Sequence, residues 1–155
     1  MSLETKLTLS DSTISELQEL TQVNIDSRDA LNELASKTED ISIANLFQSL
    51  ATQRNQQASE LQSLVRLNCE EPRESGSFAG AARQTLIDIR AALGGGTKVM
   101  LIEAEKCEDK IKGKYEDALE NEPGTAVSDI LHRQLAAVKV GHDRVRDMRD
   151  AYHED

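Results

Sequence analysis

Apolar residues recur every three or four positions along four long stretches of the chain, which is the period of a helix that buries one face. In the first stretch, for example, Leu17, Leu31 and Leu34 fall in step with one another. The pattern therefore predicts long helices at about residues 12–36, 40–71, 98–120 and 125–152.

Polar residues and helix breakers mark the predicted helix ends. Ser12 is expected to cap the first helix, and Thr125 or Ser128 the last, because a hydroxyl oxygen can accept hydrogen bonds from first-turn amides. The sequence Asn-Glu-Pro-Gly at residues 121–124 is expected to end the third helix. A glycine run at residues 94–96 lacks the strand and the Lys-Ser/Thr of a phosphate-binding loop, and is interpreted as a helix stop.

The lengths of the connections indicate the topology. Two of the links are tight, whereas a crossover at about residues 70–97 separates the second and third helices and contains a short helical pattern at residues 79–93. One long connection is typical of ferritin-like bundles and is not needed in an up-down-up-down bundle. We predict one all-α domain over residues 1–155, an antiparallel, ferritin-like four-helix bundle (about residues 12–152) with a short extra helix between helices 2 and 3.

Composition supports the all-α prediction and excludes some partners. Aromatic residues make up only 3% of the chain, which disfavours a β-sandwich. The net charge of -10 disfavours nucleic acid and anionic membrane surfaces, which are bound by clustered Lys and Arg. The sequence has no apolar run long enough to span a bilayer and no signal peptide, so a cytoplasmic location is expected.

Polar side chains interrupt each apolar stripe near its middle, at positions expected to face the other helices. Buried charges are costly unless they are paired, so Arg54 and Lys139 are expected to face acidic residues of the third helix. The residues predicted to form this polar layer are Asn24, Arg28, Arg54, Gln57, Glu105, Glu108, Lys139 and His142.

Two motifs in this layer carry a resemblance to known proteins. The second predicted helix contains Leu46-Phe47-x-x-Leu50-Ala51-x-x-Arg54-x-x-Gln57, and the fourth contains Lys139-x-x-His142. Both resemble helices of rubrerythrin-type ferritin-like proteins, which have Glu-x-x-His at these two places. The resemblance implies a degenerate metal site in which three of the four ligands of these motifs have been replaced.

From about residue 14 to residue 152, the chain is also similar to a bacterial family of ferritin-like four-helix-bundle proteins of unknown function. The shared features are Leu-Ala-x-x-Arg at residues 50–54, Glu-Pro-x-x-Ser-Gly-Ser-x-x-Gly-Ala at 71–81, Glu-x-Glu-x-x-Glu-Asp at 103–109 and His-Asp-Arg-Val-Arg at 142–146. This similarity implies the bundle fold, and no catalytic role comes with it.

The polar layer has too few ligands for a dinuclear metal centre, which needs about four carboxylates and two histidines. Arg54 and Lys139 would also repel a cation, so no metal is expected there. An alternative is an unorthodox iron or manganese site formed by Glu105, Glu108 and His142 and completed by one further residue, Asn24, Asp26 or Gln57.

The leading functional prediction is a non-enzymatic bundle in which a polar or ionic network replaces the di-metal layer and which acts through binding or self-association. No nucleophile with a neighbouring base is visible. Apolar residues of the short predicted helix, such as Leu86 and Ile89, could form a homodimer contact, and the identity of any protein partner stays open. The alternative is a metal-binding oxidoreductase or metal-storage protein that uses Glu105, Glu108 and His142.

Overall fold

The structure is a computed structural model that describes residues 9–68, 72 and 96–152. This part of the chain is all-α: it contains helices and no strand. The bounds of the helices are α1 Asp11–Lys37, α2 Ile41–Leu67, α4 Thr97–Glu120 and α5 Thr125–Ala151. Apart from a second helix that ends some residues earlier, these bounds agree with the ranges predicted from the apolar period. The crossover segment and its predicted short helix at residues 79–93 lie outside the described residues.

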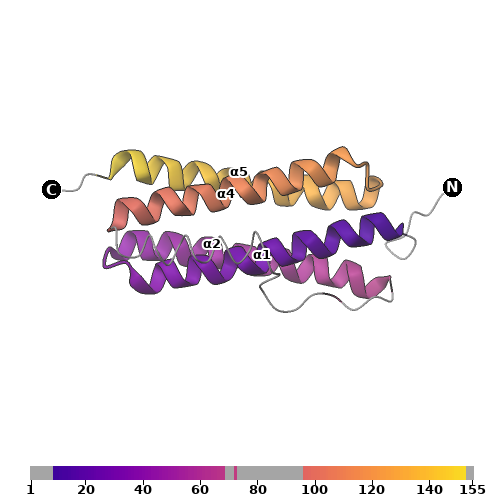
Figure 1. Ribbon diagram of the computed structural model, residues 1–155, viewed down its shortest axis with the longest axis horizontal. Coiled ribbons are helices and arrows are strands. Elements are labelled where there is room, and N and C mark those ends of the chain that lie inside the picture. The colour runs from indigo at the N-terminus through magenta and orange to yellow at the C-terminus, as the bar shows by residue number, and fades with distance from the viewer. Residues whose placement is uncertain (1–8, 69–71, 73–95, 153–155) are drawn as a thin grey trace.

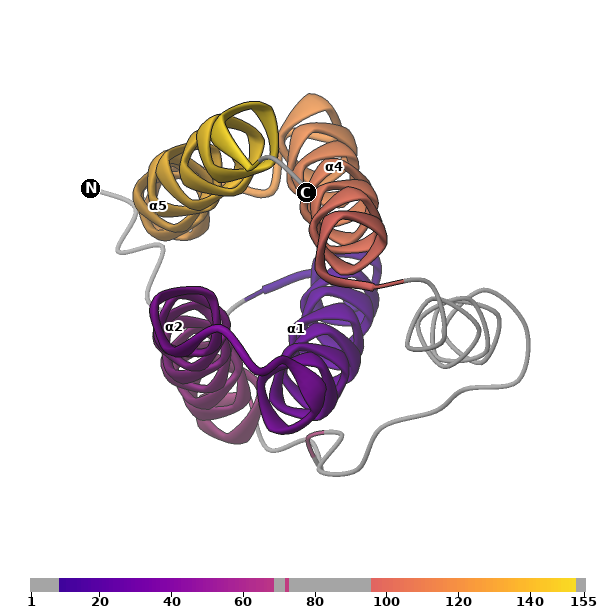
Figure 2. The ribbon, with the colours of Figure 1, turned by 90° about the vertical axis from the view of Figure 1, so that its left-hand side faces the viewer.

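Two helical hairpins pack against each other along their length. Residues 38–40 join α1 to α2, and residues 121–124 join α4 to α5. A view along the helices shows them arranged around a common centre (Figure 2). Helix α1 contacts both α2 and α4, while α5 contacts α4 and, over fewer residues, α2. Each helix therefore turns one face to the shared interior.

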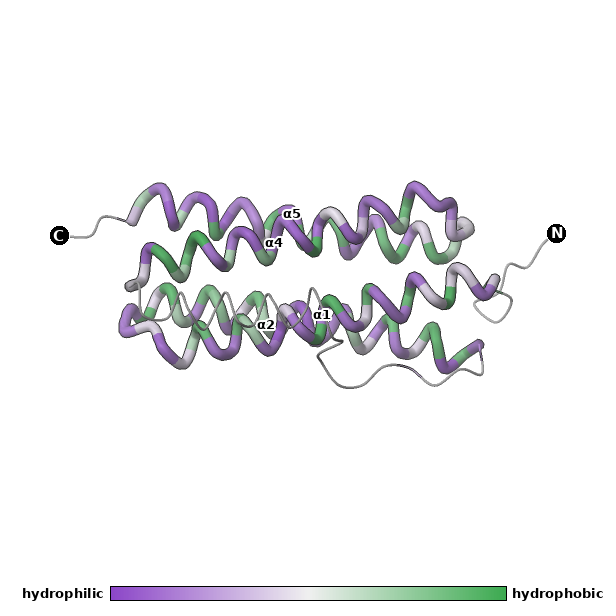
Figure 3. Tube along the Cα trace, in the orientation of Figure 1, coloured by the Kyte–Doolittle hydropathy of each residue, from purple (hydrophilic) through white to green (hydrophobic). Residues whose placement is uncertain are grey.

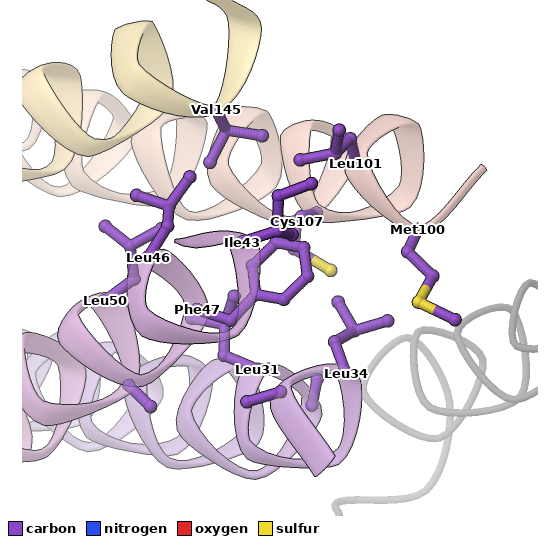
Figure 4. Packing of buried hydrophobic residues seen from close by; sticks show 14 residues of the cluster. Leu31, Leu34, Ile43, Leu46, Phe47, Leu50, Met100, Leu101, Cys107 and Val145 are labelled. Carbon is purple, nitrogen blue, oxygen red and sulfur yellow. The ribbon is translucent and has the colours of Figure 1, made fainter. Parts of the chain in front are cut away.

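The apolar interior consists of two separate clusters, one toward each end of the helices. The first is shown in Figure 4, where Leu31, Phe47, Leu101 and Val145 point toward one another from all four helices. The second lies at the other end and includes the buried Leu61 and Ile111 of α2 and α4 together with residues of α1 and α5. Apolar positions alternate with polar ones along every helix (Figure 3), as an amphipathic bundle requires.

The helix caps differ in part from those predicted. The cap of α1 is Ser10, whose side chain accepts a hydrogen bond from Thr13 N, and not Ser12, which lies inside the exposed first turn. Helix α5 has no side-chain cap: its N-cap is Gly124 with φ 95°, a left-handed conformation that favours glycine, and the prediction of Thr125 or Ser128 was wrong. Local sequence alone did not distinguish between neighbouring hydroxyls.

No helix in the described part of the chain is long and apolar enough to cross a membrane. Each long helix carries charged residues around its outer surface, for example Lys37 on α1 and Asp147 on α5. The lack of a membrane-spanning helix in this part of the chain agrees with the sequence, in which no apolar run is long enough to span a bilayer.

Replacing Ser10 by alanine should lower the free energy of unfolding by about 1 kcal/mol, because the amide of Thr13 loses its side-chain acceptor. Ser12→Ala is the matched control and should change stability by less than about 0.5 kcal/mol, since Ser12 is exposed. Urea unfolding followed by circular dichroism measures both. Equal losses in the two variants would contradict the assignment of Ser10 as the cap.

Candidate functional site

A buried polar layer separates the two apolar clusters. It receives side chains from all four helices, and each of them is at most 5% exposed. A bundle of this size could bury apolar residues at these positions, so the polar layer is the part of the interior that packing alone does not explain. Its main members are Asn24 of α1, Arg54 and Gln57 of α2, Glu108 and Tyr115 of α4, and Gln134 of α5.

The centre of this layer is an ion pair between Arg54 and Glu108. Both side chains are 0% exposed, and Nη2 of Arg54 donates a hydrogen bond to Oε2 of Glu108. Nη1 of Arg54 also donates to Oε1 of Gln53 at 2.7 Å and to Oε1 of Gln57 at 3.1 Å. Removing a guanidinium from water is costly unless a carboxylate and further acceptors surround it, and these three residues of α2 and α4 supply them.

The two charges of the pair depend on each other. Burial raises the pKa of the Glu108 carboxyl above its ordinary value, and the charge and hydrogen bond of Arg54 oppose that increase. In the described part of the chain, Arg54 Nε and Glu108 Oε1 are buried without a hydrogen-bond partner. Glu108 therefore depends chiefly on Arg54, and loss of Arg54 would leave a buried carboxylate with little compensation.

A second group of hydrogen bonds continues the layer toward the other apolar cluster. Asn24 Nδ2 donates to the Tyr115 hydroxyl at 2.9 Å, and that hydroxyl donates to Oε1 of Gln134 at 2.5 Å. Nε2 of Gln134 donates to Oε1 of Glu60 at 2.7 Å. Nε2 of Gln57 donates to the main-chain carbonyl oxygen of Gln134 at 3.2 Å. Burial raises the pKa of Tyr115, so its hydroxyl stays protonated and can donate.

Gly141 of α5 lies close to Leu50 and beside the ion pair. A Cβ atom at this position would lie 2.7 Å from Leu50 Cδ2, and 3.5 Å from both Arg54 Nη2 and Glu108 Oε2. Carbon atoms pack no closer than about 3.5 Å without repulsion. A larger residue here would have to displace the Leu50 side chain, whereas the ion pair would be in ordinary contact with the new Cβ, so the glycine is favoured by the close approach of α5 to Leu50.

A second polar cluster lies at the outer edge of the α4–α5 contact. His142 Nε2 is 2.8 Å from Asp109 Oδ1 and 3.7 Å from Glu105 Oε1, and its Nδ1 is 3.2 Å from Asp143 Oδ1. Arg149 donates to the other oxygen of Glu105. Glu105, Asp109 and His142 each offer one ligand atom, and the three atoms lie within 4.8 Å of one another. Among the described residues, this is the group whose geometry suits a metal ion.

Several residues predicted for the central layer lie elsewhere. Lys139 is exposed, because Val138 and Gly141 occupy the inward positions of α5 and each residue turns a helix by about 100°. Arg28 is on the outer surface, where it donates to Asn55 Oδ1 at 2.9 Å and pairs with Asp29. The expectation that Lys139 and Arg28 belong to the layer was wrong.

The acidic and histidine candidates divide between the two clusters. Glu108 faces Arg54, whereas Glu105 contacts Arg149 and lies near His142 at the rim, which corrects the expectation that both acids point inward together. Asp26 accepts a hydrogen bond from Gln22 on its own helix. Glu105, Glu108 and His142 therefore do not come together as one group, because Glu108 lies in the central layer while Glu105 and His142 lie at the rim.

Sequence reasoning missed Gln134, Gly141 and the role of Asp109. Gln134 stands where the apolar period of α5 expects a core residue, between Leu131 and Val138, so its polarity was a usable signal. Asp109 was expected to be solvated, and its side chain is 59% exposed, yet it contacts His142. Nothing in the sequence alone distinguishes Gly141, because its importance comes from the approach of another helix.

Arg54→Met should lower the free energy of unfolding by about 3–5 kcal/mol, because Glu108 is left as an uncompensated buried charge. Adding Glu108→Leu should recover most of that loss, since an apolar pair can replace a buried ion pair. A double-mutant cycle from urea unfolding gives the coupling energy, with Arg28→Met as the control for losing a surface arginine. Additive losses would show that the two side chains do not depend on each other.

Gly141→Ala should destabilise the protein by about 1–3 kcal/mol, because the new methyl group overlaps Leu50. Gly113→Ala in α4 is the matched control: a Cβ there meets nothing within 4 Å, so better helix propensity should stabilise the protein by up to about 1 kcal/mol. Thermal unfolding of both variants tests the difference in sign. A stabilising Gly141→Ala would mean that α5 does not approach Leu50 this closely.

The comparisons with known proteins give a family and no activity. No curated protein matches the chain. A family model described as a domain of unknown function, DUF2383, matches residues 12–121, which cover α1, α2 and α4 and end before α5. The match includes Arg54 and Glu108 but not Gly141, Gln134 or His142. Because the matched region covers most of the chain, the protein belongs to the DUF2383 family of domains of unknown function.

Proposed function

We propose that this protein has the ferritin-like topology, an antiparallel four-helix bundle with one long crossover. The segment between Leu67 and Thr97 supports the proposal because of its length. A helix of 27 residues is about 40 Å long, and a connection of this size can return along such a helix. Helix α4 can then begin at the end of the bundle where α1 ends and α2 begins, which is where its first buried residues, Met100 and Leu101, pack.

Within that topology, we propose a non-enzymatic protein in which an ionic network replaces a di-metal layer. The observation that carries this proposal is the fully buried Arg54–Glu108 pair between the two apolar clusters. Ferritin-like metal proteins place a glutamate on two helices and Glu-x-x-His on the other two, all pointing inward. Here Arg54 and Gln57 take those positions on α2, and Val138 and Gly141 are the inward pair with the same spacing on α5.

These residues do not fit two metal ions. Glu108 is the one carboxylate that is fully buried among the described residues, whereas a di-metal centre needs about four. A guanidinium beside Glu108 supplies the positive charge that a metal would otherwise supply. The shortage of carboxylates and the presence of this guanidinium are consistent with each other, which favours an ionic layer over a damaged metal site.

The protein would then act through binding or self-association. Helices α2 and α5 approach each other over fewer residues than the other neighbouring pairs and leave two hollows along their seam. One, of about 380 Å³, is lined mainly by polar side chains of α2 and α5, including Gln53, Gln56, Glu60 and Arg133. The other, of about 620 Å³, is more apolar and includes Leu46 and Met148. A protein partner or a second copy could use this seam, and the acidic surface disfavours nucleic acid and anionic membranes.

Metal analysis of protein expressed in medium supplemented with iron and manganese tests the proposal. We expect the metal content to be the same in the wild type and in Arg54→Met/Glu108→Leu, and no dioxygen consumption with ferrous iron above the buffer rate. Glu116→Gln, an exposed position on α4, is the control for the loss of a carboxylate. Two metal ions per chain that disappear only in the double variant, together with iron oxidation, would establish the metal-dependent alternative.

A further inference from the structure

The second polar cluster, which we call the rim cluster, consists of Glu105, Asp109 and His142. It brings together three ligand groups from two helices. Glu105 and Asp109 are four residues apart on α4, so both point from the same face of that helix, and His142 faces them from α5. Glu105 and His142 are partly buried, with side chains 14% and 16% exposed, whereas Asp109 is 59% exposed. The cluster is therefore positioned by helix packing and stays open to solvent on one side.

Two polar atoms of the cluster that do not face its centre, Oε2 of Glu105 and Nδ1 of His142, have partners that orient it. Arg149 binds the second oxygen of Glu105, which leaves Oε1 directed toward His142. Asp143, itself 3.2 Å from Arg146 Nη1, contacts Nδ1 of His142 at 3.2 Å. A carboxylate that binds one ring nitrogen of a histidine is the usual outer partner of a metal-binding imidazole, because it sets the tautomer and the ring orientation.

This arrangement directs three acceptor atoms at one point. When Nδ1 carries the proton that it donates to Asp143, Nε2 presents a lone pair to oxygens of Asp109 and Glu105. Three acceptors at distances of 2.8–4.8 Å repel one another unless a proton or a cation lies between them. Ligands bound at about 2.0–2.2 Å from a metal are about 3–4 Å apart, so the spacing needs only small side-chain adjustments.

The charges next to the cluster nearly balance. Glu108 is the neighbour of Asp109 on α4, and Arg54 neutralises it, although Oε1 of Glu108 is buried without a hydrogen-bond partner in the described part of the chain. Arg149 offsets part of the negative charge and should limit the affinity rather than block the site, because it holds the oxygen that faces away from His142.

We propose that Glu105, Asp109 and His142 bind one divalent transition-metal ion at the α4–α5 rim, apart from the central ionic layer. Two carboxylate oxygens and one imidazole nitrogen suit Zn²⁺, Mn²⁺ or Fe²⁺, and the open side leaves coordination positions for water. The site differs from a ferritin-like centre in lying outside the interior layer and in using Asp109. It does not depend on whether the protein is an enzyme.

Calorimetric titration of the metal-free protein with Zn²⁺ tests the site. We expect one ion per chain, with affinity at least tenfold lower in Asp109→Asn and in His142→Gln. Asp117→Asn is the matched control, because it removes an exposed aspartate from the same helix and should leave the affinity unchanged. Circular dichroism and thermal unfolding check that the variants fold, which the exposure of Asp109 favours.

Two further measurements separate this proposal from general binding to an acidic surface and from a central site. Co²⁺ should give visible absorption bands in the wild type that are lost in His142→Gln, and Arg54→Met/Glu108→Leu should keep its Zn²⁺ affinity. Equal Zn²⁺ affinity of the wild type and an Asp109→Asn/His142→Gln double variant would overturn the rim site. Loss of Zn²⁺ binding in the central variant alone would overturn both the rim site and the ionic-layer proposal.

Discussion

A guanidinium group with no exposed surface has to be neutralised where it lies, and the interior of this bundle is arranged around that requirement. A buried guanidinium is costly unless a carboxylate and further acceptors surround it, and the side chain of Arg54 is 0% exposed. Glu108 supplies the opposite charge from α4, and Gln53 and Gln57 accept two further hydrogen bonds from Nη1 of Arg54. Helices α2 and α4 are therefore tied to the placement of one side chain.

The same requirement accounts for the division of the interior into two apolar clusters. Leucines and other apolar residues on either side exclude water from the layer, which strengthens each polar contact inside it. A shift of α2 or α4 by one turn would place Arg54 or Glu108 against apolar side chains. The ion pair contributes little net stability compared with apolar packing, but it makes alternative helix registers costly.

The sequence predicted the parts of this structure that repeat along a helix. The apolar period located the four helices, and the interruptions of that period at Arg54, Gln57 and Glu108 indicated a buried polar layer. The prediction that Lys139 faces the interior was wrong because it placed the inward face of α5 one residue from its true position. A step of one residue along a helix rotates the side-chain direction by about 100°. The roles of Gly141 and Asp109 depend on the distance between two helices, which no pattern within one helix contains.

The layer also has a consequence for the order of folding. Each hairpin joins helices that are close in sequence, whereas the contacts of the layer link residues far apart: Arg54 and Glu108 are separated by 54 positions, and Asn24 and Tyr115 by 91. Loop closure makes such distant contacts slow to form, so we expect the hairpins to assemble first and to dock second. Arg54 would lose its water only at docking. That dehydration then selects the native register. Two hairpins that meet out of register remove water from Arg54 without pairing it with Glu108, so they separate again.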